Sequence, residues 1–169
     1  RMKVWFFRSS PEFDAVQVAN KALIEQLAVD PHSAGWQVDE DPKALLAVII
    51  LLDQFSRSVF RGTPQAFASD ELCADLIDRI PLGSPSFPKE EPAANLLEGS
   101  WFLERYSPIE RFFLCVALQH SEKLNHQTTG IHIASLVGHG ASDDIIHYFA
   151  NLKGFPMEHH DVIQRFGRF

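Results

Sequence analysis

The segment ALLAVIILL at residues 44–52, which contains no polar side chain, constrains the fold of this chain more than any other feature. It follows Asp41-Pro42, a helix N-cap with proline at the first helical position. Gly62 lies beyond it as a stop signal. The pattern predicts a helix from residue 42 to about residue 60. Because its middle is apolar on all sides, this helix should be the central, buried one.

Polar side chains follow this apolar segment directly, at Asp53, Gln54, Arg57 and Arg61. Asp53 and Arg57 are four residues apart and can pair on one helix face. In one interpretation the pair is structural and Arg61 is solvated near the helix end. In the other, an anionic ligand lies between the arginines. We expect a division, with Asp53 and Arg57 chiefly structural and Arg61 facing a ligand at a pocket mouth.

Helical patterns with N-terminal caps extend over most of the chain, and no segment alternates with the period of a strand. Capping signals stand at Ser9, Asp41 and Ser107, and Gly167 is placed to end the last helix. The fold class is therefore all-α, with short loops joining antiparallel helical hairpins and little or no sheet. We expect one domain over residues 1–169, as the ordered part of a longer chain. The Pro-, Gly- and Glu-rich stretch 81–100 should be a surface loop insertion.

Two histidines interrupt apolar stripes at helical spacing. His120 is seven residues beyond Phe113, on nearly the same azimuth, and Gln127 continues that line if the helix extends so far. His159 shares a face with Ile163. An unpaired buried polar group costs about 1–3 kcal/mol, so we expect both imidazoles to be largely buried and hydrogen-bonded. Glu122 is rotated away from His120 and should cap, flank or meet a neighbouring helix.

Composition excludes several classes of function. The net charge of −7 and the pI of about 5.5 argue against nucleic-acid binding. No apolar run is long enough to cross a bilayer, so we expect no membrane partner. Cys73 and Cys115 fit no metal-binding spacing and should be buried free thiols in a reducing compartment, which predicts a cytoplasmic protein. No nucleotide-loop, zinc-protease or serine-hydrolase motif is present, and the sequence predicts neither a metal site nor a cofactor.

Three segments together resemble one known family. They are LLDQFSRSVFRGTPQAFASD at 51–70, QHSEKLNHQ at 119–127 and HHDVIQRFGRF at 159–169. They are similar to the LLDQFxRxxxRGTxxAFxxD, HSExxxxQ and HRDxIxRFGRF patterns of DUF924, a group of bacterial and fungal proteins of unknown function. The chain departs from these patterns in having His160 where the family has arginine and in lacking a proline shortly before His120.

The resemblance implies an all-α, TPR-like right-handed superhelix, which no repeat in this sequence predicts by itself. It carries over positions that match the motifs, without assigned roles. These positions are Asp53, Gln54, Arg57, Arg61, Asp70, His120, Ser121, Glu122, Gln127, His159, Asp161, Arg165 and Arg168.

Two hypotheses of different class follow. In the first, the matched segments line one pocket that binds an anionic small molecule, with arginines holding a carboxylate or phosphate. His120 or His159 would then serve as catalytic acid or base. Its binding residues would be Asp53, Gln54, Arg57, Arg61, Glu122, Gln127, Arg165 and Arg168. In the second, a TPR-like module binds an acidic peptide in a concave groove. The sequence indicates neither a reaction nor an oligomeric state.

Overall fold

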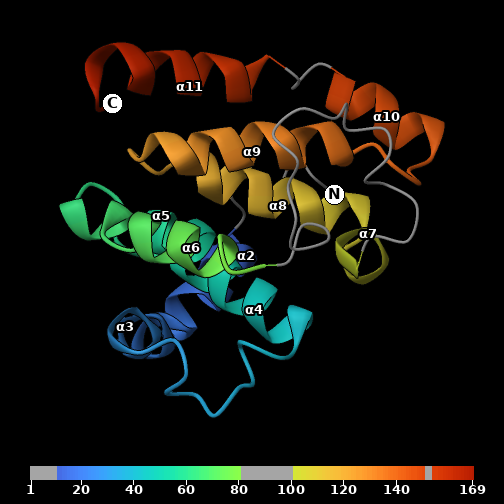
Figure 1. Cartoon of the computed structure of the whole chain (residues 1–169). Coiled ribbons are helices and arrows are strands. Elements are labelled where there is room, and N and C mark those ends of the chain that lie inside the picture. Colours follow the sequence, from blue (N-terminus) through green and yellow to red (C-terminus); the bar gives the residue numbers. More distant parts are fainter. Residues whose placement is uncertain (1–10, 81–100, 151–153) are drawn as a thin grey trace. The chain divides into compact units, whose positions relative to one another are not determined.

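The computed structural model describes residues 11–80, 101–150 and 154–169. Within these ranges the chain is helical and contains no strand, which confirms the predicted all-α class (Figure 1). By its internal contacts it divides into two compact units, Arg1–Leu72 and Cys73–Phe169. The prediction for the 81–100 stretch lies outside the described residues. No helix in the described ranges has both the length and the apolar character needed to cross a membrane.

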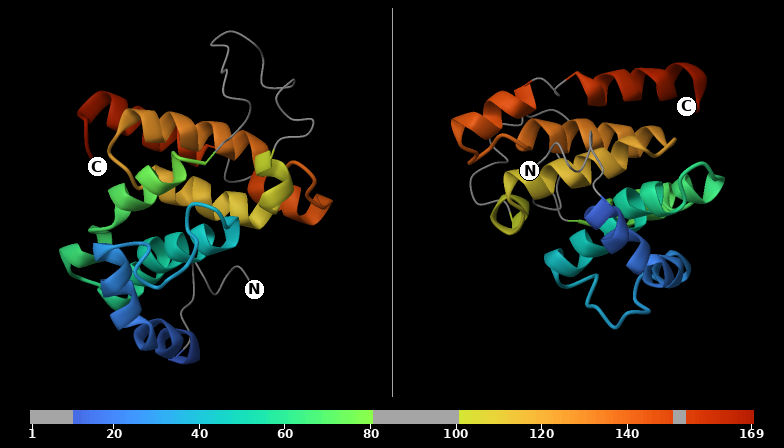
Figure 2. Two further views of the ribbon diagram at one scale, coloured as in Figure 1. Left: turned by 60° about the horizontal axis from the view of Figure 1, so that its bottom comes forward. Right: turned by 180° about the vertical axis from the view of Figure 1, so that it is seen from behind.

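The first unit contains the predicted central helix. Asp41 is its N-cap and accepts a hydrogen bond from the Lys43 N–H at 2.8 Å, as the sequence predicted. The segment then continues without a break as α4, η1 and α5, and helix α2 packs against α5 while α3 packs against η1 and α5 (Figure 2). The element bounds are α2 Pro11–Ala19, α3 Lys21–Val29, α4 Pro42–Ile49, η1 Ile50–Phe55, α5 Ser56–Val59 and η2 Pro64–Phe67.

Element η1 is a π-helical segment in the middle of the central helix. At its end the Ser56 N–H donates to the carbonyl of Leu51, five residues back rather than four. Leu52 and Asp53 are both fully buried in this segment, at 0% exposure. The wider π turn changes the direction of the side chains that follow it, and π segments are frequent at functional sites.

The apolar pattern that follows Ser9 predicts one helix to about Leu27, but the structure divides it into α2 and α3 at Asn20. The side-chain amide of Asn20 donates to the Val16 carbonyl at 2.7 Å. The helical spacing of Phe13, Val16, Leu23 and Leu27 predicts one inward-facing stripe, but Val16 is 54% exposed. Gln17 is buried in its place, at 3% exposure. The break at Asn20 rotates α2 relative to the periodicity of residues 13–27, so one continuous stripe does not form. The predicted cap at Ser9 lies outside the described residues.

In the second unit, α8 and α9 lie side by side, joined by the short connection 120–123, and α11 packs on both (Figure 1). The capping box at Ser107 is confirmed, with its N–H donating to Glu110 Oε2 at 2.7 Å. Gly167 ends α11 in the left-handed region at φ +74°, also as predicted. The bounds are α6 Asp70–Ile77, which begins in the first unit, then α7 Trp101–Arg105, α8 Pro108–Gln119, α9 Leu124–Leu136, α10 Asp143–Ala150 and α11 Phe155–Phe166.

Arg111 is buried where these helices meet, at 3% exposure. Its guanidinium donates to the carbonyls of Leu136 at 3.0 Å, His139 at 2.7 Å and Leu103 at 2.8 Å. Burial lowers the pKa of Arg111, and the neighbouring Glu110 acts in the opposite direction. The side chain therefore joins α8 to the end of α9 and to α7.

Both cysteines are free and buried, as predicted. Burial raises the pKa of the Cys115 thiol to about 12, and a hydrogen bond from the Gln119 amide opposes that rise. A thiol held so firmly in its neutral form is a poor nucleophile, so Cys115 serves packing rather than chemistry.

Candidate functional site

A carboxylate–guanidinium cluster forms around the π-helical segment in the first unit. Arg57 Nη1 donates to Asp53 Oδ1 at 2.9 Å and to the Asp53 carbonyl at 2.7 Å. The same nitrogen contacts Asp70 Oδ1 at 2.9 Å, and Nη2 contacts Asp70 Oδ2 at 3.0 Å. Gln54 donates its amide to the other oxygen of Asp53. The sequence-predicted residues Asp53, Gln54 and Arg57 are thus brought together.

The donors and acceptors of this cluster are largely used within it. The Arg57 side chain is 22% exposed, the Asp70 side chain 13% and the Asp53 side chain 1%. The guanidinium also lies 5.4 Å from the centre of the Phe67 ring. Two carboxylates and one guanidinium leave a net negative charge, which does not favour an anionic ligand. The geometry supports a structural role for Arg57.

Arg61 lies in a different setting, one turn beyond Arg57. It is exposed, and none of the described residues forms a hydrogen bond or an ion pair with its guanidinium. It lines a pocket of about 160 Å³ whose other lining residues are Asp14, Gln17, Val18 and Ser58. We refer to this cavity as the Arg61 pocket. All five residues belong to the first unit.

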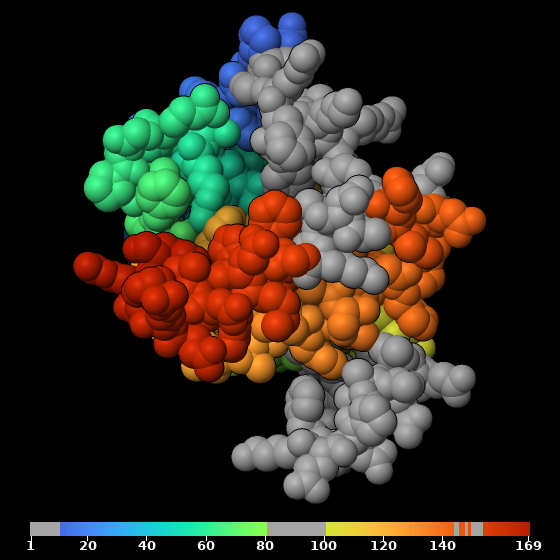
Figure 3. Space-filling model, turned by 90° about the horizontal axis from the view of Figure 1, so that it is seen from above, coloured from blue at the N-terminus to red at the C-terminus, as the bar shows by residue number. Residues whose placement is uncertain are grey.

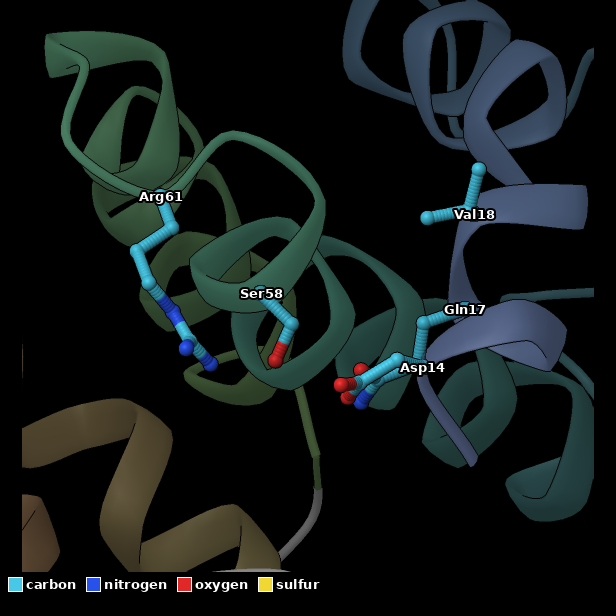
Figure 4. A pocket seen from close by; sticks show the side chains of 5 residues that line it. All are labelled: Asp14, Gln17, Val18, Ser58 and Arg61. Carbon is cyan, nitrogen blue, oxygen red and sulfur yellow. The ribbon is translucent and has the colours of Figure 1, made fainter. Parts of the chain in front are cut away.

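Two elements supply the lining of the Arg61 pocket. Helix α2 contributes Asp14, Gln17 and Val18, α5 contributes Ser58, and the turn that follows α5 contributes Arg61. Figure 4 shows the polar ends of Asp14 and Gln17 directed toward the side where the Ser58 hydroxyl and the Arg61 guanidinium lie. The packing of α2 against α5 therefore assembles the pocket.

Gln17 is the unusual member of this lining. The residue is 3% exposed, yet its Oε1 atom has no hydrogen-bond partner among the described residues. An unsatisfied buried acceptor of this kind costs about 1–3 kcal/mol and calls for an explanation, such as a bound water or ligand. Sequence reasoning missed Asp14, Gln17 and Ser58 as site residues. Their spacing on two separate helices gives no local signal, since the helices meet only in the fold.

The predicted residues of the second unit have mainly structural partners. Gln127 is 1% exposed and donates its amide to the carbonyls of Ser121 at 2.6 Å, Gln119 at 3.0 Å and Leu118 at 3.4 Å. The carbonyls of Leu118 and Gln119 belong to the last turn of α8 and that of Ser121 follows it, so Gln127 caps that helix from α9. Helix α8 does not reach Gln127, because it ends at Gln119. His120 and Gln127 therefore do not continue one stripe of α8.

The two candidate catalytic histidines are half-buried rather than largely buried. His120 is the C-cap residue of α8, so the end of the helix removes it from the stripe of Phe113. His159 Nδ1 lies 2.7 Å from the Phe155 carbonyl, one turn earlier in α11. Ile163 is 4% exposed, as expected for the buried face of this helix. Neither histidine lines the Arg61 pocket.

The remaining candidates of the second unit are exposed. Glu122 accepts a hydrogen bond from the Phe169 N–H at 3.0 Å, and so joins the residues after α8 to those after α11. Arg165 lies 5.1 Å from the Phe166 ring, and Arg168 is exposed. Figure 3 shows α11 at the surface of its unit. None of these side chains lines the Arg61 pocket.

A buried histidine that was not predicted lies near Gln127. His126 is 2% exposed, with Nδ1 2.8 Å from Ser121 Oγ and Nε2 3.3 Å from Asp75 Oδ1. The serine hydroxyl has 0% exposure and also accepts from the Lys123 N–H at 3.1 Å. This chain of contacts from serine to histidine to aspartate resembles the catalytic triad of a hydrolase. A substrate, however, cannot reach a fully buried hydroxyl. The arrangement fixes the start of α9.

The chain matches the family described as "Bacterial protein of unknown function (DUF924)" over residues 1–169. No curated protein and no solved structure matches it. The match covers both units, including the cluster around Arg57 and the Arg61 pocket. The chain therefore belongs to the DUF924 family, whose description assigns no function.

Proposed function

We propose that the first unit binds a small molecule through an anionic group, a carboxylate or phosphate, in the Arg61 pocket. The observation that carries the proposal is a guanidinium that lines a cavity and has no partner among the described residues. That guanidinium belongs to Arg61; Gln17 Oε1, a buried acceptor without a partner in the same cavity, requires a donor elsewhere on the ligand. A guanidinium offers five N–H donors in a planar fork, which suits a carboxylate or phosphate.

The contrast between Arg57 and Arg61 supports this choice of residue. Arg57 already binds two carboxylates and a carbonyl, so a ligand would have to displace them. Arg61 would give up only water. Both arginines match the family motif, but only Arg61 lines the pocket.

The pocket volume supports a small ligand rather than a peptide. At about 160 Å³ it is well above the roughly 10–15 Å³ that one water needs. It is below the roughly 300–1,000 Å³ typical of sites for drug-sized ligands. Because the candidate histidines do not line the pocket, the proposal is for binding and assigns no acid–base step to His120 or His159.

Calorimetric titration with acetate, lactate and inorganic phosphate tests the proposal. We expect at least one to bind the intact chain and Arg61→Gln to weaken that binding about ten- to a hundredfold, which corresponds to about 1.5–3 kcal/mol. Arg79→Gln removes the same charge from an exposed position in the second unit and should leave the affinity unchanged.

The proposal is wrong if none of these anions binds in an Arg61-dependent way. It is equally wrong if Arg79→Gln weakens binding as much as Arg61→Gln does. The second result would indicate that binding depends on the overall charge of the protein rather than on Arg61. Binding of that kind would also weaken as the salt concentration rises. Far-UV circular dichroism on each variant ensures that the comparison is between folded proteins.

A further inference from the structure

We infer that the ligand of the Arg61 pocket is a zwitterion, with a carboxylate and an ammonium group at the spacing of a small α-amino acid. The inference rests on the proposed function and specifies its ligand class. Its basis is the set of charges and acceptors that line the cavity: one guanidinium, one carboxylate, one buried amide oxygen and one hydroxyl. They belong to Arg61, Asp14, Gln17 and Ser58.

The unpartnered Oε1 atom of Gln17 indicates which kind of group the ligand must carry. Oε1 is an acceptor, so it needs a donor from the ligand. A carboxylate or a fully ionised phosphate has only acceptors and would leave that atom unsatisfied. An ammonium group carries three donors. A ligand that satisfies both Gln17 and Arg61 must therefore present a donor at one end and an anion at the other.

The charges of the lining lead to the same conclusion independently. Arg61 supplies the one positive charge among the five lining residues and Asp14 the one negative charge. They come from different elements of the first unit. A dianion would place its second charge in a cavity that already holds a carboxylate. A zwitterion is neutral overall and matches both charges.

The placement of the side chains defines the orientation. The ligand carboxylate would bind Arg61, with the Ser58 hydroxyl as a second donor, and the ammonium would bind Gln17 Oε1 and the Asp14 carboxylate. A carboxylate can accept several hydrogen bonds at once, so Asp14 can keep other partners while binding the ammonium. Val18 offers an apolar contact for a short side chain. Figure 4 shows these four polar groups converging from α2 and from the end of the central helix.

Thermal-shift screening of the standard α-amino acids at millimolar concentration, followed by calorimetry on the best of them, tests the inference. That amino acid is then compared with two analogues, the acid that lacks its amino group and the amine that lacks its carboxylate. We expect each analogue to bind the intact chain at least about tenfold more weakly.

The variants separate the two ends of the ligand. Arg61→Gln should weaken the amino acid and the acid alike. Asp14→Asn should weaken the amino acid about tenfold while leaving the acid unchanged or bound more tightly, because a repulsive charge is removed. Glu40→Gln, which removes an exposed negative charge of the same unit, should change neither.

The possible outcomes distinguish the inference from the proposal beneath it. If the acid binds as tightly as the amino acid and depends on Arg61 but not on Asp14, the zwitterion is wrong and anion binding stands. If no compound of this series and none of the simple anions binds in an Arg61-dependent way, both are wrong. The comparison of analogues on the unmodified chain decides the point even if Asp14→Asn fails to fold.

Discussion

Arg57 and Asp70, 13 residues apart, are joined by two parallel hydrogen bonds of 2.9 and 3.0 Å between the guanidinium and the carboxylate. A bidentate pair fixes orientation as well as distance. It connects the end of the central helix to the first residue of α6, across the turn that contains η2. The same guanidinium also neutralises the fully buried Asp53. One side chain thus joins η1, α5 and the first residue of α6.

Replacing Arg57 by methionine should destabilise the protein by about 3 kcal/mol, because it leaves the buried Asp53 without its counter-charge. Adding Asp53→Asn should recover part of the loss. Urea unfolding of the single and double variants measures both effects. Arg61→Met, at an exposed position of the same segment, should change the unfolding free energy by less than about 0.5 kcal/mol. Equal losses for the two arginines would contradict the structural role of Arg57.

The amide of Gln127 makes a second prediction possible. Gln127→Leu removes the donor to three carbonyls at the end of α8, so we expect a loss of about 1–3 kcal/mol in unfolding free energy. Gln127→Glu should be at least as costly, since its carboxylate would face those carbonyl oxygens. Chemical denaturation provides the measurement, with the exposed Gln164→Leu as control. A Glu variant as stable as the unmodified chain would show that the amide is not a donor here.

His132 makes the stability of the chain depend on pH. Burial lowers its pKa in the folded state, so the unfolded chain takes up a proton first, at about pH 6.5. The unfolding free energy should therefore fall as the pH falls below about 6.5, and this contribution should level off below the pKa of the folded state. In His132→Gln this part of the pH dependence disappears. Unfolding curves of both proteins at about pH 8 and about pH 5 test the prediction. If the unfolding free energy of the variant changes between the two pH values as much as that of the unmodified chain, the prediction is refuted.

Gly130 allows the close approach of α8 and α9. A Cβ added there would lie 3.3 Å from Leu118 Cβ, closer than side chains normally pack. Alanine gains about 1 kcal/mol of helix propensity over glycine, so for Gly130→Ala the crowding and the gain should nearly cancel. Gly130→Val adds two more methyl groups and should cost about 1–3 kcal/mol. Thermal unfolding of both variants tests the contact. If valine were tolerated as well as alanine, the two helices would not be held at this separation.

Capping residues explain why many element boundaries could be predicted from the sequence. Asp41, Ser107 and Gly167 act on backbone groups a few residues away, so their identity alone indicates the helix end. The π-helical segment could not be predicted in this way. Where a helix is apolar on all sides, the sequence pattern does not show which side chains share a face. An extra residue in one turn therefore cannot be detected from the residue types.

The candidate site was predicted in part for a related reason. Arg61 stands in a family motif and at a helix end, so the sequence pointed to it. Its pocket partners Asp14 and Gln17 lie more than forty residues earlier in the chain. Only the packing of α2 against α5 brings them together. Gln127 was correctly expected to be buried, but as part of α8. The connection 120–123 contains no glycine or proline to mark the break.

Because of the π-helical turn at Ile50–Phe55, the number of residues in this segment is constrained as well as their type. Deleting one residue before Asp53 would let the chain close into an uninterrupted α-helix with little backbone strain. The preceding residues of α4 would then rotate by about 100° relative to Arg57 and Asp70, since an α-helix has about 3.6 residues per turn. Leu45 and Val48, buried at present, would turn away from their neighbours. Insertions and deletions that surface loops accept should therefore be absent from this segment throughout evolution.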